Sequence, residues 1–500
     1  MCGIIVVHGE PMEPAIGLDH RGPDRYIVKT MEKCTMHFYR LAINDLSHTG
    51  DQPFIRRDSM LVCNGEIYNH RQLRTGKELS NSDCECIIHL IRSKGIYKTC
   101  KQLRGDYAFV WTDGEHVMAA RDPFGVRPLF YTRHSPRSIS FSSEVKSIIS
   151  KNNKIHIFPP GHFYDSRQDR FVCYYNNYWM SKPVIGNVYN DLRTTFLRAV
   201  NIRLDSTERP VGFLLSGGLD SSLVVACAKI LKFPKIKTFA IGEPNSPDIL
   251  AAREVASHLG TDHTEVIFNF KEGLDNIKNV IRCLETYDTT TIRASTPMWL
   301  LCKWIKENTK CRVILSGEGS DEIFGGYKYF SFAPNESEFN AELQRRVHLL
   351  HQFDVLRADR CTAGHGLELR VPFLDRDFID YVLQMEPSLK MTLLEKQVLR
   401  DSFKGVLTDK ILYRKKDAFS DAVGYGWVGT VRDYMSNKIS DEQFDIICKK
   451  ANGHNVPTTK EEAYYRAKYW SMYGEQNDHL VTEIWRPRWT TVTDPSARRL

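Results

Sequence analysis

The 500-residue sequence predicts two parts of different fold class, an α+β part followed by an α/β part with a helical C-terminal region. Residues 1–175 carry short aromatic and β-branched runs broken by turns, which is typical of stacked, largely antiparallel sheets covered by helices. From residue 211 onward, apolar runs alternate with longer helical patterns, which predicts a doubly wound parallel sheet. The length suggests two or more domains of ~150 residues, and we place them at 1–180 and 181–500.

The strands expected in the first part are short, and turn residues such as Asp113-Gly114 separate them. The main helix is expected at 84–94, with Gly95 as its stop signal. The expected strands are 3–7, 36–40, 60–63, 107–111, 116–120, 129–132, 138–141 and 171–174.

In the second part an amphipathic helix at 189–204 precedes the parallel sheet. A helix at 248–259 is bounded by Pro247 and Gly260, which favour its first turn and its end. The chain to about residue 475 reads as mainly helical, and 485–500 reads as a loose, basic tail. The expected strands are 211–215, 237–241, 263–267 and 312–315.

The segment Ser216-Gly217-Gly218-Leu219-Asp220-Ser221-Ser222 lies where an expected strand turns into an expected helix. Glycines let backbone N–H groups approach a ligand, and the N-terminus of the helix favours phosphate. Asp220 suits an anion site only beside a cation, which Mg²⁺ on a nucleotide would supply. The segment lacks the Walker lysine, so adenylation with release of pyrophosphate fits better than γ-phosphoryl transfer. A plain Gly-Gly turn is the alternative, and the fixed Asp and Ser positions weigh against it.

Composition excludes few functions. The net charge of +7 is mild, and 42% hydrophobic with 26% charged residues is ordinary for a globular chain. Without a run of about 18 apolar residues, no transmembrane helix is expected, and residues 1–9 do not resemble a signal peptide. The thirteen cysteines are scattered without a C-x-x-C pair, which indicates reduced thiols in the cytoplasm.

Several polar residues of the first part together match the groups of glutamine. Cys2 would carry both a thiol and a free α-amine as base if Met1 is removed. Asn64 and Gly65 follow an expected strand and could form an oxyanion hole, and Arg40 could clamp a carboxylate. Asp83 could bind an ammonium group or cap a helix. Each residue alone also fits a turn, a surface charge or a cap, but the set supplies nucleophile, oxyanion donors and both charge partners.

The motifs resemble two known families and cover nearly the whole chain. Those of the second half resemble the adenylating synthetase half of the glutamine-hydrolysing asparagine synthetase family: 216–222, Ser316-Gly317-Glu318-Gly319-Ser320-Asp321-Glu322 and Arg370-Val371-Pro372-Phe373-Leu374-Asp375. Those of the first half resemble N-terminal-nucleophile glutamine amidotransferases: Met1-Cys2-Gly3-Ile4, His20-Arg21-Gly22-Pro23-Asp24, Arg40-Leu41-Ala42-Ile43, Asn64-Gly65-Glu66-Ile67-Tyr68-Asn69, Ser82-Asp83-Cys84-Glu85, 104–109 and Arg121-Asp122-Pro123-Phe124-Gly125.

This resemblance implies an N-terminal-nucleophile hydrolase fold joined to a PP-loop ATP pyrophosphatase fold. It implies a ligase that hydrolyses glutamine through a Cys2 thioester and passes ammonia through a tunnel to β-aspartyl-AMP, which Mg·ATP and aspartate form. The products would be asparagine, glutamate, AMP and pyrophosphate. The implied enzyme is cytoplasmic and binds small molecules, not nucleic acid or membrane; it carries no tight prosthetic group, and a homodimer is possible.

The resemblance also assigns residues. Cys2 would be the nucleophile, Asn64 and Gly65 the oxyanion hole, and Glu318 the carboxylate tied to intermediate formation and ammonia attack. The glutamine pocket would contain Arg40, Leu41, Ile43, Asn44, Glu66 and Asp83. Asp220 and Asp321 would bind magnesium. The ATP site would contain Leu214, Ser216, Gly217, Gly218, Asp220, Ser221, Ile241, Ser316, Gly317, Asp321 and Lys416.

The sequence departs from the family at 9–20 and 70–82, which are short, and at Asn44 and Ala418. These departures bear on glutaminase rate and pocket detail. The alternatives are a β-lactam-synthetase-like enzyme, a tRNA-modifying enzyme and a non-catalytic glutamine sensor. The first tends to lose the N-terminal Cys, the second would need catalytic cysteines and a basic RNA surface, and the complete residue sets disfavour the third.

Overall fold

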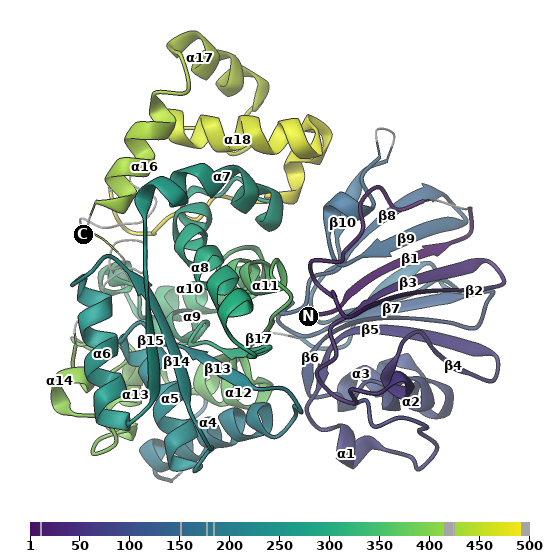
Figure 1. Ribbon diagram of the computed structural model, residues 1–500, viewed down its shortest axis with the longest axis horizontal. Helices are drawn as coiled ribbons and strands as arrows, with labels where there is room; N and C mark the ends of the chain where they lie inside the picture. Colours follow the sequence, from purple (N-terminus) through teal and green to yellow (C-terminus); the bar gives the residue numbers. More distant parts are fainter. Residues whose placement is uncertain are drawn as a thin grey trace.

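A computed structural model describes residues 1–10, 13–150, 153–176, 179–183, 186–414, 424 and 426–491. Two parts lie side by side, a β-sheet sandwich and a helix-covered sheet (Figure 1). Every helix among these residues is too short or too polar to cross a membrane.

The first part consists of two six-stranded sheets of the expected antiparallel kind. Alternating residues of β1 (Gly3–His8) serve two cores, because Ile4 and Val6 pack between the sheets while Ile5 packs on the opposite face. The strand orders are β10-β8-β9-β1-β3-β2 and β12-β11-β7-β6-β5-β4. The other strands are β2 (Arg25–Met31), β3 (Cys34–Arg40), β4 (Phe54–Arg56), β5 (Ser59–Ile67), β6 (Gly105–Thr112), β7 (Val117–Arg121), β8 (Phe130–Ser135), β9 (Ser138–Ser142), β10 (Ile155–Ile157), β11 (His162–Asp165) and β12 (Arg170–Cys173).

Among the described residues of this part, three helices cover the sheets and two 3₁₀ turns join strands. The expected helix at 84–94 begins slightly later, and Gly95 ends it with φ 76°. The helices are α1 (His70–Leu73), α2 (Cys86–Lys94) and α3 (Ile96–Gln102), and the turns are η1 (His48–Gly50) and η2 (Val145–Ser147).

The second part is built on a five-stranded parallel sheet, as the alternation of strands and helices predicts. Its strand order is β15-β14-β13-β16-β17. The strands are β13 (Val211–Leu214), β14 (Lys237–Gly242), β15 (Asp262–Ile267), β16 (Val313–Leu315) and β17 (Glu368–Arg370).

Helices surround this sheet, and α16 to α18 form a lobe beyond it (Figure 1). Gly260 ends α6 in the left-handed conformation, as its position predicts. The helices are α4 (Val188–Leu204), α5 (Leu219–Ile230), α6 (Pro247–Leu259), α7 (Phe270–Leu284), α8 (Thr289–Asn308), α9 (Ser320–Phe324), α10 (Glu336–Leu349), α11 (Asp354–Ala363), α12 (Arg376–Gln384), α13 (Gln397–Ser402), α14 (Asp409–Leu412), α16 (Trp427–Ser436), α17 (Asp441–Lys450) and α18 (Lys460–Tyr473). The 3₁₀ turns are η3 (Lys328–Phe332), η4 (Leu350–Gln352), η5 (Pro372–Leu374), η6 (Pro387–Leu389) and η7 (Glu475–Leu480).

Two expectations about local structure are wrong. Asn64 and Gly65 do not follow a strand but lie inside β5, where Asn64 pairs with Ala108 of β6. The start of the expected loose tail is ordered, because Trp485 is buried and Trp489 packs on Tyr329. In both places the sequence is rich in polar residues, so the burial of Asn64 and Trp485 could not be predicted from it.

Candidate active site

The loop 216–222 joins β13 to α5 at the C-terminal edge of the sheet. Gly217 has φ 72°, and a Cβ there would lie 2.4 Å from the backbone of Ala251 and of Ala252 in α6. Gly218 has φ −71° and is the N-cap of α5, so only Gly217 needs the left-handed conformation. The close approach of α6 explains the first glycine.

The loop 316–322 follows the adjacent strand β16 and touches the first loop. A Cβ on Gly317 would lie 2.8 Å from the backbone nitrogen of Ser221. The hydroxyl of Ser320 donates to Asp220 at 2.7 Å. The two motifs therefore meet at one sheet edge, where open α/β sheets bind ligands.

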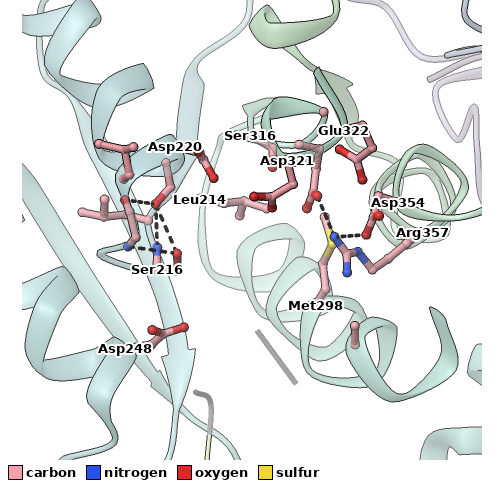
Figure 2. Close-up of a pocket in the computed structure, with 18 of the residues that line it drawn as sticks. Leu214, Ser216, Asp220, Asp248, Met298, Ser316, Asp321, Glu322, Asp354 and Arg357 are labelled. Atoms are coloured by element: carbon pink, nitrogen blue, oxygen red, sulfur yellow. Dashed lines mark hydrogen bonds and ion pairs between the residues drawn. The ribbon is translucent and has the colours of Figure 1, made fainter. Parts of the chain in front are cut away.

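A cavity of about 250 Å³ opens between these loops, α8 and α11 (Figure 2). Gly217 does not line it, because its backbone packs against α6, and Lys416 lies outside the described residues. The predicted residues that line it are Leu214, Ser216, Gly218, Asp220, Ser221, Ile241, Ser316, Gly317, Glu318 and Asp321.

Lys396 is a residue of this cavity that the sequence did not reveal. Its buried ammonium group contacts Asp220 at 2.7 Å and Asp321 at 2.6 Å. Both carboxylates thus face one cation position, and a carboxylate pair completed by nucleotide phosphates is a ligand set that suits Mg²⁺. Within the described ranges, no three His, Cys, Asp or Glu side chains are grouped so that they could hold a metal ion by themselves.

Glu318, on the same loop as Asp321, is held by α11. Its carboxylate accepts a hydrogen bond from Arg357 at 2.6 Å, and Arg357 also contacts Asp354 at 2.8 Å (Figure 2). Burial raises the pKa of Glu318, repulsion by Asp354 adds to this, and Arg357 opposes it. A carboxylate whose pKa is raised is a stronger proton acceptor than one with the usual pKa.

In the first part, Cys2 lies at the start of β1 with its sulfur near Leu41. The backbone N–H of Leu41 lies 3.4 Å from the sulfur, and Arg21 donates to the Cys2 carbonyl at 3.0 Å. The amine of Met1 donates to the Leu367 carbonyl at 2.9 Å. Burial raises the pKa of the Cys2 thiol to about 11 and lowers the pKa of the Met1 amine to about 5.

Asn64 is fully buried, and its side-chain amide has no hydrogen-bond partner within the described part of the chain. Such a group costs free energy unless a ligand satisfies it. A Cβ on Gly65 would lie 2.2 Å from the Asp106 carbonyl, so this strand position requires glycine. A buried side-chain amide without a hydrogen-bond partner, next to a glycine, is consistent with an oxyanion hole.

The remaining predicted pocket residues divide into two groups. Asn44 donates to Glu66 at 2.7 Å and lies 3.5 Å from Asp83. Asp83 does not cap α2, whose N-cap is Glu85; it accepts from the backbone of Ile67 at 2.6 Å. Burial and repulsion by Asp83 raise the pKa of Glu66 well above its usual range. The Asn44 amide thus joins the two carboxyl groups, which lie close together.

Arg40 has a different set of partners. It donates to the Ser47 carbonyl at 2.7 Å and also contacts Asp45 and Asp51. Its guanidinium group is thus engaged by the loop 45–51. Leu41 and Ile43 are buried beside it.

Comparison with known proteins identifies the class first. A glutamine amidotransferase domain model matches residues 1–179, and the asparagine synthase model matches 191–339 and 331–494. A probable asparagine synthetase (glutamine-hydrolyzing) of Dictyostelium discoideum is 39% identical over 100% of this chain and 98% of the relative. A protein of the same description from Schizosaccharomyces pombe is 40% identical over 100% and 98%. Asparagine synthetase (glutamine-hydrolyzing) 2 of Oryza sativa is 40% identical over 100% and 92%.

These matches define an amidotransferase domain joined to an asparagine synthase domain. The chain belongs to the asparagine synthase family.

Proposed function

We propose that this protein makes asparagine from aspartate, with ATP as the energy source and glutamine as the nitrogen donor. The observation that carries the proposal is the presence in one chain of both residue sets, an N-terminal Cys2 with a vacant Asn64 amide and a nucleotide-type cavity at the sheet edge. The full-length similarity to glutamine-hydrolysing relatives supports it.

In the proposed glutaminase step, removal of Met1 leaves the α-amine on Cys2. That amine takes the thiol proton as sulfur attacks the amide carbon of glutamine. The Asn64 amide and the Gly65 N–H stabilise the oxyanion of the tetrahedral intermediate. Ammonia then departs, and water hydrolyses the glutamyl thioester that remains. The acidic pair of Glu66 and Asp83 suits the substrate ammonium group. Arg40 would have to leave its loop to clamp the carboxylate.

In the proposed synthetase step, the β-carboxylate of aspartate attacks the α-phosphorus of ATP and pyrophosphate leaves. Asp220 and Asp321 would hold Mg²⁺, which supplies charge neutralisation for the phosphates when bound. Lys396 adds a cation at the same place. Ammonia then attacks the β-aspartyl-AMP, Glu318 accepts a proton, and AMP leaves. Lys416 would contribute a phosphate contact.

The proposal includes domains at 1–180 and 181–500, and an internal ammonia path between them. Action in the cytoplasm fits the thirteen free thiols, all of which lie in the described ranges. A homodimer without nucleic-acid ligands completes the proposal.

The test is product analysis of the purified protein with glutamine, aspartate, ATP and Mg²⁺. Asparagine, glutamate, AMP and pyrophosphate should appear in equal amounts. Formation of ADP and phosphate, or glutamate release without any asparagine, would refute the proposed reaction.

A further inference from the structure

The two parts meet across a buried ionic contact that centres on α11. This helix and β17 lie on the side of the second part that faces the N-terminus (Figure 1). Arg357 on α11 contacts Glu318 in the synthetase cavity. Asp359 follows two residues later, roughly 200° around the helix, and so faces the first part.

Asp359 reaches the nucleophile through a single side chain. Its carboxylate accepts from Arg21 at 3.1 Å, and Arg21 donates through Nε to the Cys2 carbonyl at 3.0 Å. Arg21 is fully buried and Asp359 is 1% exposed. The planar guanidinium group presents its donors in a fixed fork, so holding one edge at Asp359 sets the direction of the other.

Arg21 has a second acceptor, but that acceptor is shared. Glu144 accepts a hydrogen bond from Arg21 at 2.8 Å, forms an ion pair with Arg360 at 2.7 Å, and also contacts Lys146. Without Asp359, Glu144 would be the carboxylate left to Arg21, and Arg360 and Lys146 contact that carboxylate as well.

We propose that Asp359 of the synthetase part is a positioning residue for the Cys2 nucleophile, acting through Arg21. This inference rests on the proposed function, because it assumes that Cys2 hydrolyses glutamine. The glutaminase site is therefore completed by the other part of the chain.

The test compares Asp359→Asn with Glu285→Gln, since both replace a buried interface carboxylate with its amide. Glu285 binds Arg360 at 2.8 Å and the backbone of Val145 at 2.9 Å, but it does not contact Arg21. We expect Asp359→Asn to lower kcat for glutamine hydrolysis by ~10–100-fold, because misplacement near 1 Å has that effect. KM for glutamine and asparagine formation from ammonium should stay near wild type.

Glu285→Gln should lower Tm to a similar extent while keeping the hydrolysis kcat. Arg21→Lys keeps the charge but loses the fork, so it should reproduce the loss of hydrolysis kcat; it decides the matter if Asp359→Asn does not fold. Equal loss of hydrolysis in Asp359→Asn and Glu285→Gln, or equal loss of both activities in Asp359→Asn, would overturn the inference. If wild type makes no asparagine from ammonium, the proposed function fails instead, and the hydrolysis comparison still stands.

Discussion

At the scale of single residues, Asp321 and Glu318 share one loop but have different partners. Asp321 contacts Lys396 in the carboxylate pair, whereas Glu318 contacts Arg357 on α11. We therefore expect Asp321 to act in the neutralisation of pyrophosphate charge and Glu318 to act in the acceptance of a proton from ammonia.

We predict that Asp321→Asn lowers aspartate-dependent exchange of pyrophosphate into ATP by about 100-fold or more, because the carboxylate charge that would hold Mg²⁺ at the leaving group is lost. Glu318→Gln should lower asparagine formation by ~10²–10⁴-fold, the range for a positioned base. Exchange persists in Glu318→Gln if this carboxylate acts only in ammonia attack, and disappears if it also shapes the adenylate.

Glutamine hydrolysis is the internal control for both variants, since Cys2 lies in the other part. Strong exchange in Asp321→Asn would refute the magnesium assignment. Undiminished asparagine formation in Glu318→Gln would refute the role of that carboxylate.

At the scale of elements, the loop between β13 and α5 depends on one glycine. We predict that Gly217→Ala lowers stability by ~1–3 kcal/mol, because its Cβ would overlap the backbone of α6. Gly218→Ala is the matched control: φ is −71°, and the nearest atom to its Cβ is the Ser216 hydroxyl at 3.3 Å. Thermal unfolding measures both, and a Gly217→Ala protein as stable as Gly218→Ala would contradict the packing argument.

The N-terminus of α8 gives a pH prediction. Asp288 caps this helix and accepts from the backbone of Trp485, and burial raises its pKa to about 7. The folded state then holds a proton that the unfolded state releases between about pH 4 and 7, so stability falls as pH rises through that window. Asp288→Asn mimics the protonated form and should be more stable than wild type at pH 8, with a smaller difference at pH 5.

Urea unfolding at pH 5 and pH 8 measures this difference. Asp375→Asn serves as the opposite case, since Asp375 caps α12 but pairs with the buried Arg203 at 3.0 Å, and its loss should destabilise. A destabilised Asp288→Asn protein at pH 8 would show that the charged form is the native one.

At the scale of the whole molecule, elements with long apolar runs could be predicted from the sequence. The strands β13 and β14 and the helix α6 lie within a residue of their expected bounds. The strand β17 could not be found, because three residues give no periodicity.

The site was predictable where a motif is continuous and not where folding brings distant residues together. Lys396 reaches Asp220 across 176 residues, and Arg357 reaches Glu318 across 39. The engagement of Arg40 by the loop 45–51 depends on side-chain geometry that no spacing reveals.

The central claim is that two separate chemistries share this chain, one at Cys2 and one in the cavity at the sheet edge. The most direct measurement is asparagine formation by Cys2→Ala with each nitrogen source. We predict no detectable synthesis with glutamine and synthesis from ammonium within about twofold of wild type, since distant sites act independently. Equal loss with both nitrogen sources would contradict the account, because Cys2 would then support the structure and not the release of ammonia.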